Sequence, residues 1–172
     1  MITDSETDRR LVDLGWQQTY VATTVMANTL VELVGDHPRT DQVEIAGDLT
    51  EDWWQGYLKY RPIPDHPTAR RILTNNPPVG LASVRIDGRL VALGRGQLTA
   101  DWLGIAGLWT DPEYRRRGLA TMIIRELAHW AARRGGRYAY LQVAQQNSGA
   151  IAAYARLGFV RHHDYRYLAP GA

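Results

Sequence analysis

The sequence predicts an α/β fold built around a mixed sheet, and three observations support this. Two strand-like runs between residues 81 and 98 are joined by Asp87-Gly88, a strong signal for a β-hairpin. A third strand-like run follows at 102–110. Beyond it, helical and strand-like segments alternate, which requires crossover connections. Hairpins join antiparallel strands, whereas crossover helices can join parallel ones. Hairpins in the first part of the sheet and crossovers in the later part therefore predict a mixed sheet.

The first half of the chain carries weaker signals. A run rich in β-branched residues predicts a strand over about 16–27, and residues 35–50 form a polar stretch. Thr50 is a plausible N-cap for a short helix within 49–60. Trp53, Trp54 and Tyr57 in that helix would either pack in the core or form an aromatic wall for a ligand. A Pro-rich break at 61–67, a second short helix at 68–73 and a further break at 74–80 follow.

The second half of the chain has clearer patterns. Gly104 and Gly107 permit a bulge in the strand at 102–110. Apolar residues recur at helical spacing from 118 to 134, where Gly135-Gly136 ends the helix. A strand at 137–144, a helix at 147–158 and an alternating strand at 159–168 complete the chain.

Composition narrows the possible classes of protein. The 172 residues suit one ordinary domain, and the net charge of +2 is too mild to indicate nucleic-acid binding. The polar, acidic start is not a signal peptide, and no apolar run reaches the roughly 18 residues of a membrane span. We therefore expect a cytoplasmic protein that does not associate with membranes. The absence of cysteine excludes disulfides, thiolate metal sites and cysteine nucleophiles.

The string "DPEYRRRGLAT" at 111–121 places three arginines just before a helix. The first backbone N–H groups of a helix lack partners and bind anions, and Gly118 lets a ligand approach the backbone closely. Arginine forks suit phosphate oxygens. The string therefore predicts a site for a multiply charged anion such as a pyrophosphate. A solvated basic turn is the alternative.

The string "NSGAIAAYARLGF" places Asn147, Ala150 and Tyr154 on one face of a short helix. Tyr154 has two interpretations. It is either a half-buried aromatic with a hydrated hydroxyl or a proton donor to a leaving group.

Two motifs at a fixed spacing resemble the GNAT family of acetyl-CoA-dependent N-acetyltransferases. They are Arg115-x-x-Gly118-x-Ala120 and, after an amphipathic helix and a strand, NxxAxxxYxxLGF. The resemblance extends from about 105 to 168, and "GLWTDPEYRRRGLA" looks most like strings of actinobacterial members. It implies a mostly antiparallel, twisted sheet flanked by helices. It also implies a V-shaped splay between the central strands, at 102–110 and 137–144, that holds acetyl-CoA.

The resemblance also implies roles for individual residues. The pyrophosphate would rest on the amides of about 116–121 beside the arginines, and backbone groups of 108–110 would pair with the pantetheine arm. Asn147 would contact the cofactor, and Tyr154 would protonate the departing thiolate. The cofactor-binding set is Leu108, Trp109, Thr110, Arg115, Arg116, Arg117, Gly118, Leu119, Ala120, Thr121 and Asn147, with Tyr154 catalytic.

The acceptor implied by the family is an amine, on a small molecule or a peptide, which attacks directly and needs no metal. The strand at 102–110 contains no carboxylate to act as general base. Asp101, Asp111, Glu113 and an ordered water stay open for that role. Two rival functions remain: a non-catalytic CoA-binding sensor or interaction module, and a nucleic-acid-binding domain based on the arginine-rich turn. Glu126 and the acids of that turn interrupt its positive charge and disfavour the second rival.

Two segments are expected. Residues 46–172 would form the GNAT domain, and residues 1–45 an N-terminal strand or extension. "DLGWQQTYVATTVM" near the start resembles "RLGFVRHHDYRYL" near the end, so the extension is either the remnant of a degenerate GNAT copy or an atypical first strand. Sheet edges make a homodimer reasonable.

Overall fold

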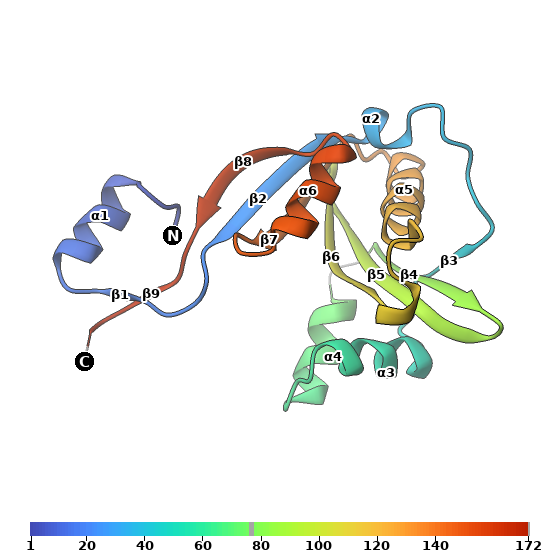
Figure 1. Ribbon diagram of the computed structural model, residues 1–172, viewed down its shortest axis with the longest axis horizontal. Coiled ribbons are helices and arrows are strands. Elements are labelled where there is room, and N and C mark those ends of the chain that lie inside the picture. Colours follow the sequence, from blue (N-terminus) through green and yellow to red (C-terminus); the bar gives the residue numbers. More distant parts are fainter. Residues whose placement is uncertain (76–77, 172) are drawn as a thin grey trace. The chain divides into compact units, whose positions relative to one another are not determined.

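A computed structural model describes residues 1–75 and 78–171, which form two compact units (Figure 1). One unit comprises residues 29–139, and the other joins residues 1–28 to residues 140–172. Residues 76 and 77, within the predicted break at 74–80, and residue 172, the last of the predicted domain, lie outside the described residues.

The unit of residues 29–139 contains an antiparallel sheet in the order β3-β4-β5-β6. The strands are β3 (Val43–Ala46), β4 (Val79–Ile86), β5 (Arg89–Thr99) and β6 (Trp102–Thr110). Ile86 pairs with Arg89 across Asp87 and Gly88, whose φ angles of 51° and 76° are those of a tight hairpin turn. The predicted hairpin is therefore confirmed, and β6 has the predicted bounds.

The predicted bulge lies in β6 at Gly107. Leu93 pairs with Trp109 and Arg95 with Ala106, so Gly107 and Leu108 both stand opposite Gly94 of β5. Gly107 has a φ of 62°, a conformation that side chains rarely adopt. The extra residue of a bulge has no partner in the ladder. Backbone groups near Leu108 are thus released from pairing with β5.

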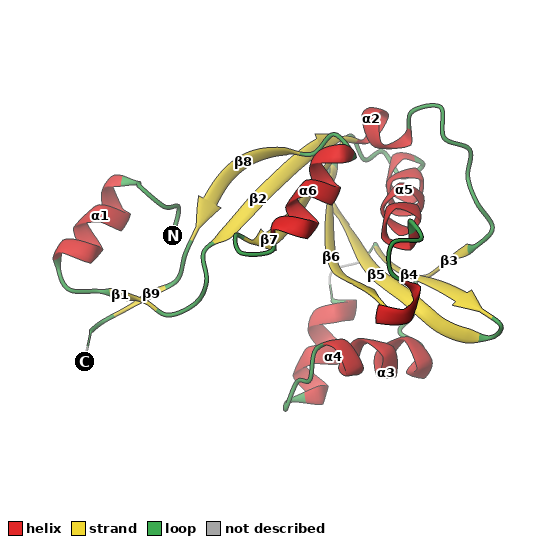
Figure 2. Cartoon of the chain, viewed as in Figure 1, coloured by secondary structure: helices red, strands yellow, loops and turns green. Residues whose placement is uncertain are grey.

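Helices cover both faces of this sheet (Figure 2). They are α2 (Leu30–Val34), α3 (Glu51–Tyr60), α4 (His66–Thr74), the 3₁₀ turn η1 (Pro112–Tyr114) and α5 (Leu119–Ala132). Neighbouring residues of β5 point to opposite faces. Leu93 belongs to the core cluster with α3, whereas a Cβ on Gly94 would lie 2.8 Å from Ile123 of α5.

The aromatic residues of α3 lie in the core. Trp53, Trp54 and Tyr57 are at most 6% exposed, and the Trp53 indole N–H donates to the Ala82 carbonyl at 3.0 Å. Thr50 caps the helix, as predicted, by accepting from the Trp53 N–H at 3.3 Å. Core packing, one of the two interpretations of this string, is the one that the structure supports.

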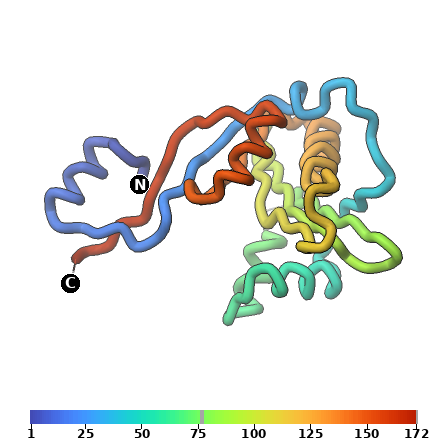
Figure 3. The backbone as a smooth tube through the Cα atoms, viewed as in Figure 1, coloured from blue at the N-terminus to red at the C-terminus, as the bar shows by residue number. Residues whose placement is uncertain are grey.

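The other unit brings the two ends of the chain together, and Figure 3 shows them running side by side. Its strands follow the order β7-β2-β8, and β1 pairs with β9. The helices are α1 (Glu6–Asp13) and α6 (Ser148–Arg156), and the strands are β1 (Gln17–Gln18), β2 (Thr23–Thr29), β7 (Tyr138–Ala144), β8 (Val160–Tyr165) and β9 (Leu168–Ala169).

Differences from prediction are concentrated near the N-terminus. The strand expected over about 16–27 is divided into β1 and β2, and three further elements, α1, α2 and β3, were not expected. A distant partner explains α1, because its buried Asp8 pairs with Arg166 at 2.7 Å across 158 positions of sequence. The fold class is confirmed: a mixed α/β protein with a mostly antiparallel sheet flanked by helices.

Candidate functional site

The N-terminus of α5 lacks the side-chain cap that the other described α-helices have. Gly118 occupies the N-cap position with a φ of 78° and no capping hydrogen bond. Ser5, Thr29, Thr50, Asp65 and Asn147 each accept a backbone N–H at the start of their helices. The first amides of α5 are therefore left to other acceptors.

The space around this helix start is open. A Cβ on Gly118 would have no heavy atom within 4 Å among its described surroundings. The helical ladder begins where the Met122 N–H donates to the Gly118 carbonyl at 3.0 Å. The amides of Leu119, Ala120 and Thr121 precede this bond and have no acceptor within the helix. A ligand can therefore approach them directly.

Three exposed arginines, Arg115 to Arg117, directly precede this helix start. The Arg115 Nε donates to the Thr110 carbonyl at 3.3 Å, which ties the loop to the end of β6. Arg117 lies over the Tyr114 ring at 4.9 Å. None of Arg115 to Arg117 forms an ion pair with a carboxylate in residues 1–75 and 78–171. Their charges add to the positive end of the helix dipole, so an anion here would be strongly favoured.

The nearby acids are occupied in shaping the turn. Asp111 accepts the Glu113 N–H at 3.1 Å and the Arg89 guanidinium at 2.7 Å, and Arg89 also pairs with Glu113 at 3.2 Å. The Glu113 N–H, followed by Arg89, holds the pKa of the Asp111 carboxyl below its ordinary value. Asp111 is thus a weak base that fixes the η1 turn.

Asp101 occupies a different place in the fold. It lies before β6, whereas Asp111 follows that strand, so about 30 Å of extended chain separates the two acids. Its carbonyl accepts the N–H groups of Arg137 and Tyr138. The three candidate bases do not form one cluster.

Arg89 is a residue that the sequence reasoning missed. It sits directly after the hairpin turn, and the pairing of Ala92 with Thr110 brings its side chain to the residues that follow β6. The register of the hairpin against the third strand could have revealed this. Arg89 organises the turn that precedes the arginines.

The predicted site residues fall in both units. Leu108 to Thr110 and Arg115 to Thr121 lie together in the unit of residues 29–139, from the β6 bulge to the start of α5. Asn147 and Tyr154 belong to α6 in the other unit. The Asn147 Oδ1 accepts the Ala150 N–H at 3.1 Å, and the Tyr154 ring meets Phe159 edge-on at 6.2 Å.

A histidine pair in β8 differs from the simple expectation that strand neighbours face opposite sides. The His162 and His163 Nδ1 atoms are 2.8 Å apart. Val25 pairs with His163 and Met26 with Arg161, so His162 is the extra residue of a bulge. A bulge interrupts the alternation of side chains. Over residues 1–75 and 78–171, no group of three or more potential ligands from His, Asp and Glu could hold a metal ion.

The same part of the chain has no helix with the length and apolar character that crossing a membrane requires. The fold is that of an α/β protein, and the start of its helix α5, beside a basic loop, leaves backbone N–H groups without a side-chain cap. A model of the acetyltransferase (GNAT) family matches residues 46–159, more than half of the chain. The chain belongs to this family, as the sequence motifs predicted.

Relatives agree with this assignment. The chain is 33% identical over 79 residues to the uncharacterized N-acetyltransferase YobR of Bacillus subtilis, covering 45% of this chain and 32% of YobR. It is 34% identical over 73 residues to the ribosomal protein bS18-alanine N-acetyltransferase of Salmonella typhimurium, covering 42% and 49%. The matched stretches span a third to a half of these relatives.

Solved structures share the fold. A GNAT-family acetyltransferase from Novosphingobium aromaticivorans superposes with a TM-score of 0.66 at 23% identity, covering 92% of this chain and 69% of that one. AAC(6')-Iy in complex with the bisubstrate analog CoA-S-monomethyl-acetylneamine gives 0.58 at 15% identity, covering 69% and 90%.

Proposed function

We propose that this protein is an N-acetyltransferase that moves an acetyl group from acetyl-CoA to a primary amine. The observation that carries the proposal is the α5 start, the one described α-helix without a side-chain cap, which follows three arginines that have no carboxylate partner among the described residues. Family membership gives the anion its identity, because GNAT proteins use acetyl-CoA.

In this proposal the pyrophosphate of CoA is bound by the α5 start. The amides of Gly118 to Thr121 and the guanidiniums of Arg115, Arg116 and Arg117 would donate to its oxygens. The Leu119 side chain is buried, so this residue would contribute its backbone alone. Asn147 already uses its Oδ1 in capping α6, which leaves its NH₂ group to donate to the cofactor.

Chemistry would follow from positioning and charge stabilisation. The β6 bulge frees backbone groups beside Leu108, and an N–H there would polarise the thioester carbonyl as negative charge develops on its oxygen. Leu108, Trp109 and Thr110 would pair with the pantetheine arm. The amine attacks the carbonyl carbon, the C–S bond breaks, and the Tyr154 hydroxyl gives its proton to the leaving thiolate.

The proton lost by the amine requires a base. β6 has no carboxylate, and Asp111 is held by Arg89, so we propose that ordered water carries this proton. The acceptor is proposed only as an amine, on a small molecule or a peptide. A homodimer stays a prediction.

Asp111 and Glu113 both pair with Arg89, so neither is free to act as general base. This favours a second candidate function, a CoA-binding module without catalysis. Isothermal titration with acetyl-CoA and CoA, followed by thiol release with a panel of amines, separates the two. We expect binding of both compounds and turnover with at least one amine. Binding without turnover across small and peptide amines would favour the module, and absence of CoA binding would refute both.

A further inference from the structure

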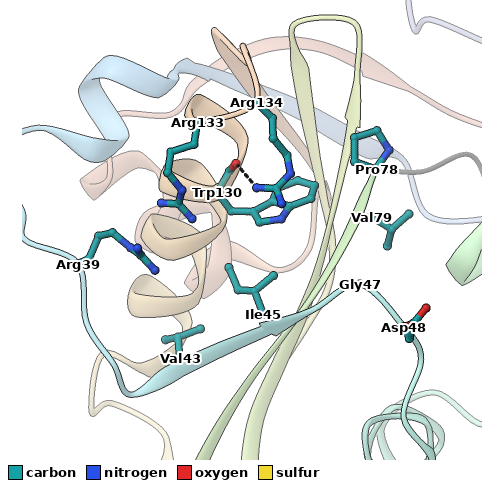
Figure 4. Close-up of a pocket in the computed structure, with 10 residues that line it drawn as sticks. All are labelled: Arg39, Val43, Ile45, Gly47, Asp48, Pro78, Val79, Trp130, Arg133 and Arg134. Atoms are coloured by element: carbon teal, nitrogen blue, oxygen red, sulfur yellow. Dashed lines mark hydrogen bonds between the residues drawn. The ribbon is translucent and has the colours of Figure 1, made fainter.

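A pocket of about 570 Å³ opens in the unit of residues 29–139, beside the C-terminal end of α5 (Figure 4). It lies between that helix end, the strand β3 and the start of β4. α5 has 14 residues, so about 20 Å of helix separates this pocket from Gly118. The pocket is therefore distinct from the proposed CoA site, and its volume is typical of sites for small molecules.

The floor of the pocket is apolar and closely packed. The Trp130 side chain is 6% exposed and lies against the β4 backbone at Gly80. A Cβ at Gly80 would come within 3.1 Å of the indole ring and 3.0 Å of Ile45 Cγ2. Because Gly80 has no side chain, the Trp130 ring and Ile45 pack directly against the β4 backbone, and this packing holds both side chains in place. The apolar lining that stays accessible to a ligand is partly exposed Ile45 and exposed Pro78.

The rim is basic. Three arginines, Arg39, Arg133 and Arg134, line the pocket against one carboxylate, Asp48, which gives the lining a formal charge of +2. Figure 4 shows the guanidiniums of Arg39 and Arg133 on one side of the pocket and Asp48 on the opposite side. Arg39 is paired with the buried Glu126 carboxylate at 3.3 Å, whereas Arg133 and Arg134 have no carboxylate partner in residues 1–75 and 78–171.

Two of these guanidiniums are positioned by the protein. The Arg134 Nη1 donates to the Trp130 carbonyl at 3.1 Å, and its Cζ lies 4.7 Å from the ring centroid. The Arg39 Nε donates to Glu126 at 3.3 Å. A guanidinium has five N–H donors, so each side chain keeps several for a ligand. Attraction to the helix dipole accounts for Arg133 and Arg134 at the end of α5, and the ion pair with Glu126 accounts for Arg39, which comes from a separate loop.

We propose that this pocket binds a small molecule that carries a doubly charged acidic group, a phosphate monoester or a dicarboxylate, on an apolar ring or chain. Two negative charges match Arg133 and Arg134, the two lining arginines without a carboxylate partner among the described residues, and the apolar portion covers Ile45 and Pro78. The proposal is independent of the acetyl-transfer function, because no residue of this pocket belongs to the proposed CoA site.

Isothermal titration with phenyl phosphate tests this proposal, using protein saturated with CoA so that the α5 start is occupied. We expect saturable binding of phenyl phosphate and none of phenol, its neutral counterpart. Phenylmalonate in a parallel titration distinguishes a dicarboxylate ligand from a phosphate. Arg133→Ala should weaken the binding by about tenfold, the loss typical of one charge-assisted hydrogen bond, whereas Arg116→Ala should leave it unchanged.

The comparison of variants decides the outcome. Equal affinity of wild type, Arg133→Ala and Arg39→Ala for phenyl phosphate would overturn the proposal, as would equal binding of phenol. Binding that disappears when CoA is present would assign the phosphate to the α5 start and would also overturn it. Should CoA itself not bind, the same titrations without CoA, compared between Arg133→Ala and Arg116→Ala, locate the ligand.

Discussion

The helices α5 and α6 begin in opposite ways. α6 has no buried residue and starts at Asn147, whose side chain caps it. α5 has eight buried residues and starts at Gly118 without a side-chain cap. A cap contributes about 1 kcal/mol, whereas burying one leucine or isoleucine contributes about 1.5–3 kcal/mol.

This difference shows which helix start is available for binding. α6 depends on its cap, because it has little packing to stabilise it. α5 is held by its buried face, so its first amides need not be satisfied by its own chain and three arginines can add to their positive field. We infer that packing along α5 makes a binding site at its end compatible with a stable fold.

The test with the largest expected effect removes the three positive charges that precede α5. In the triple variant Arg115→Ala, Arg116→Ala, Arg117→Ala we expect the Kd for CoA to rise at least about a hundredfold, since each charge-assisted contact is worth about tenfold or more. Isothermal titration measures the change. Arg133→Ala, at the other end of α5, is the control and should bind CoA normally. A triple variant within threefold of wild type would contradict the pyrophosphate assignment.

A second test asks whether α6 contributes chemistry as well as structure. Tyr154→Phe removes the hydroxyl and keeps the ring that contacts Phe159, so the fold should be unchanged. We expect kcat to fall roughly 10- to 100-fold because the thiolate loses its proton donor, with CoA affinity within about twofold. Steady-state thiol release and titration measure the two quantities. Full activity would show that Tyr154 is not the acid.

The sequence predicted most of the fold between residues 81 and 168, and the reasons are local. Asp87-Gly88 defines the hairpin, the bulge lies at Gly107, one of its two expected glycines, and earlier in the chain Thr50 caps the helix that it was predicted to cap. Turn and cap residues act on neighbours a few positions away, so a linear pattern reveals them.

The rest depends on partners far apart in sequence. Asp8 meets Arg166, and Arg89 meets Asp111, through tertiary structure that no local pattern encodes. The motif indicated the arginine loop of the candidate site, but not that Arg89 fixes the preceding turn. The basic pocket at Trp130 was missed for the same reason, because β3, β4 and α5 each supply a part of it.

A smaller effect sharpens the comparison between the two helix starts. Asn147→Ala removes the α6 cap and should lower the free energy of unfolding by about 1 kcal/mol, as measured by urea denaturation. Asn147→Asp keeps an acceptor for the Ala150 N–H and serves as the matched control. If the alanine variant is as stable as wild type, α6 does not depend on its cap, and the contrast with α5 loses its physical basis.

The smallest expected effect concerns the acid that shapes the arginine loop. The folded state lowers the Asp111 pKa, so this carboxylate stabilises the fold above its ordinary pKa of about 3.9, and the contribution is lost as the pH falls through the lower folded value. Asp111→Asn keeps an oxygen that accepts the Glu113 N–H and removes only the negative charge. The effect should be small because the Arg89 guanidinium that pairs with this charge is half-exposed, and solvent screens the pair. Urea denaturation should find the variant less stable than wild type at pH 7 and the gap narrowed at pH 2. A gap of equal size at both pH values would mean that the charge of Asp111 does not stabilise the turn.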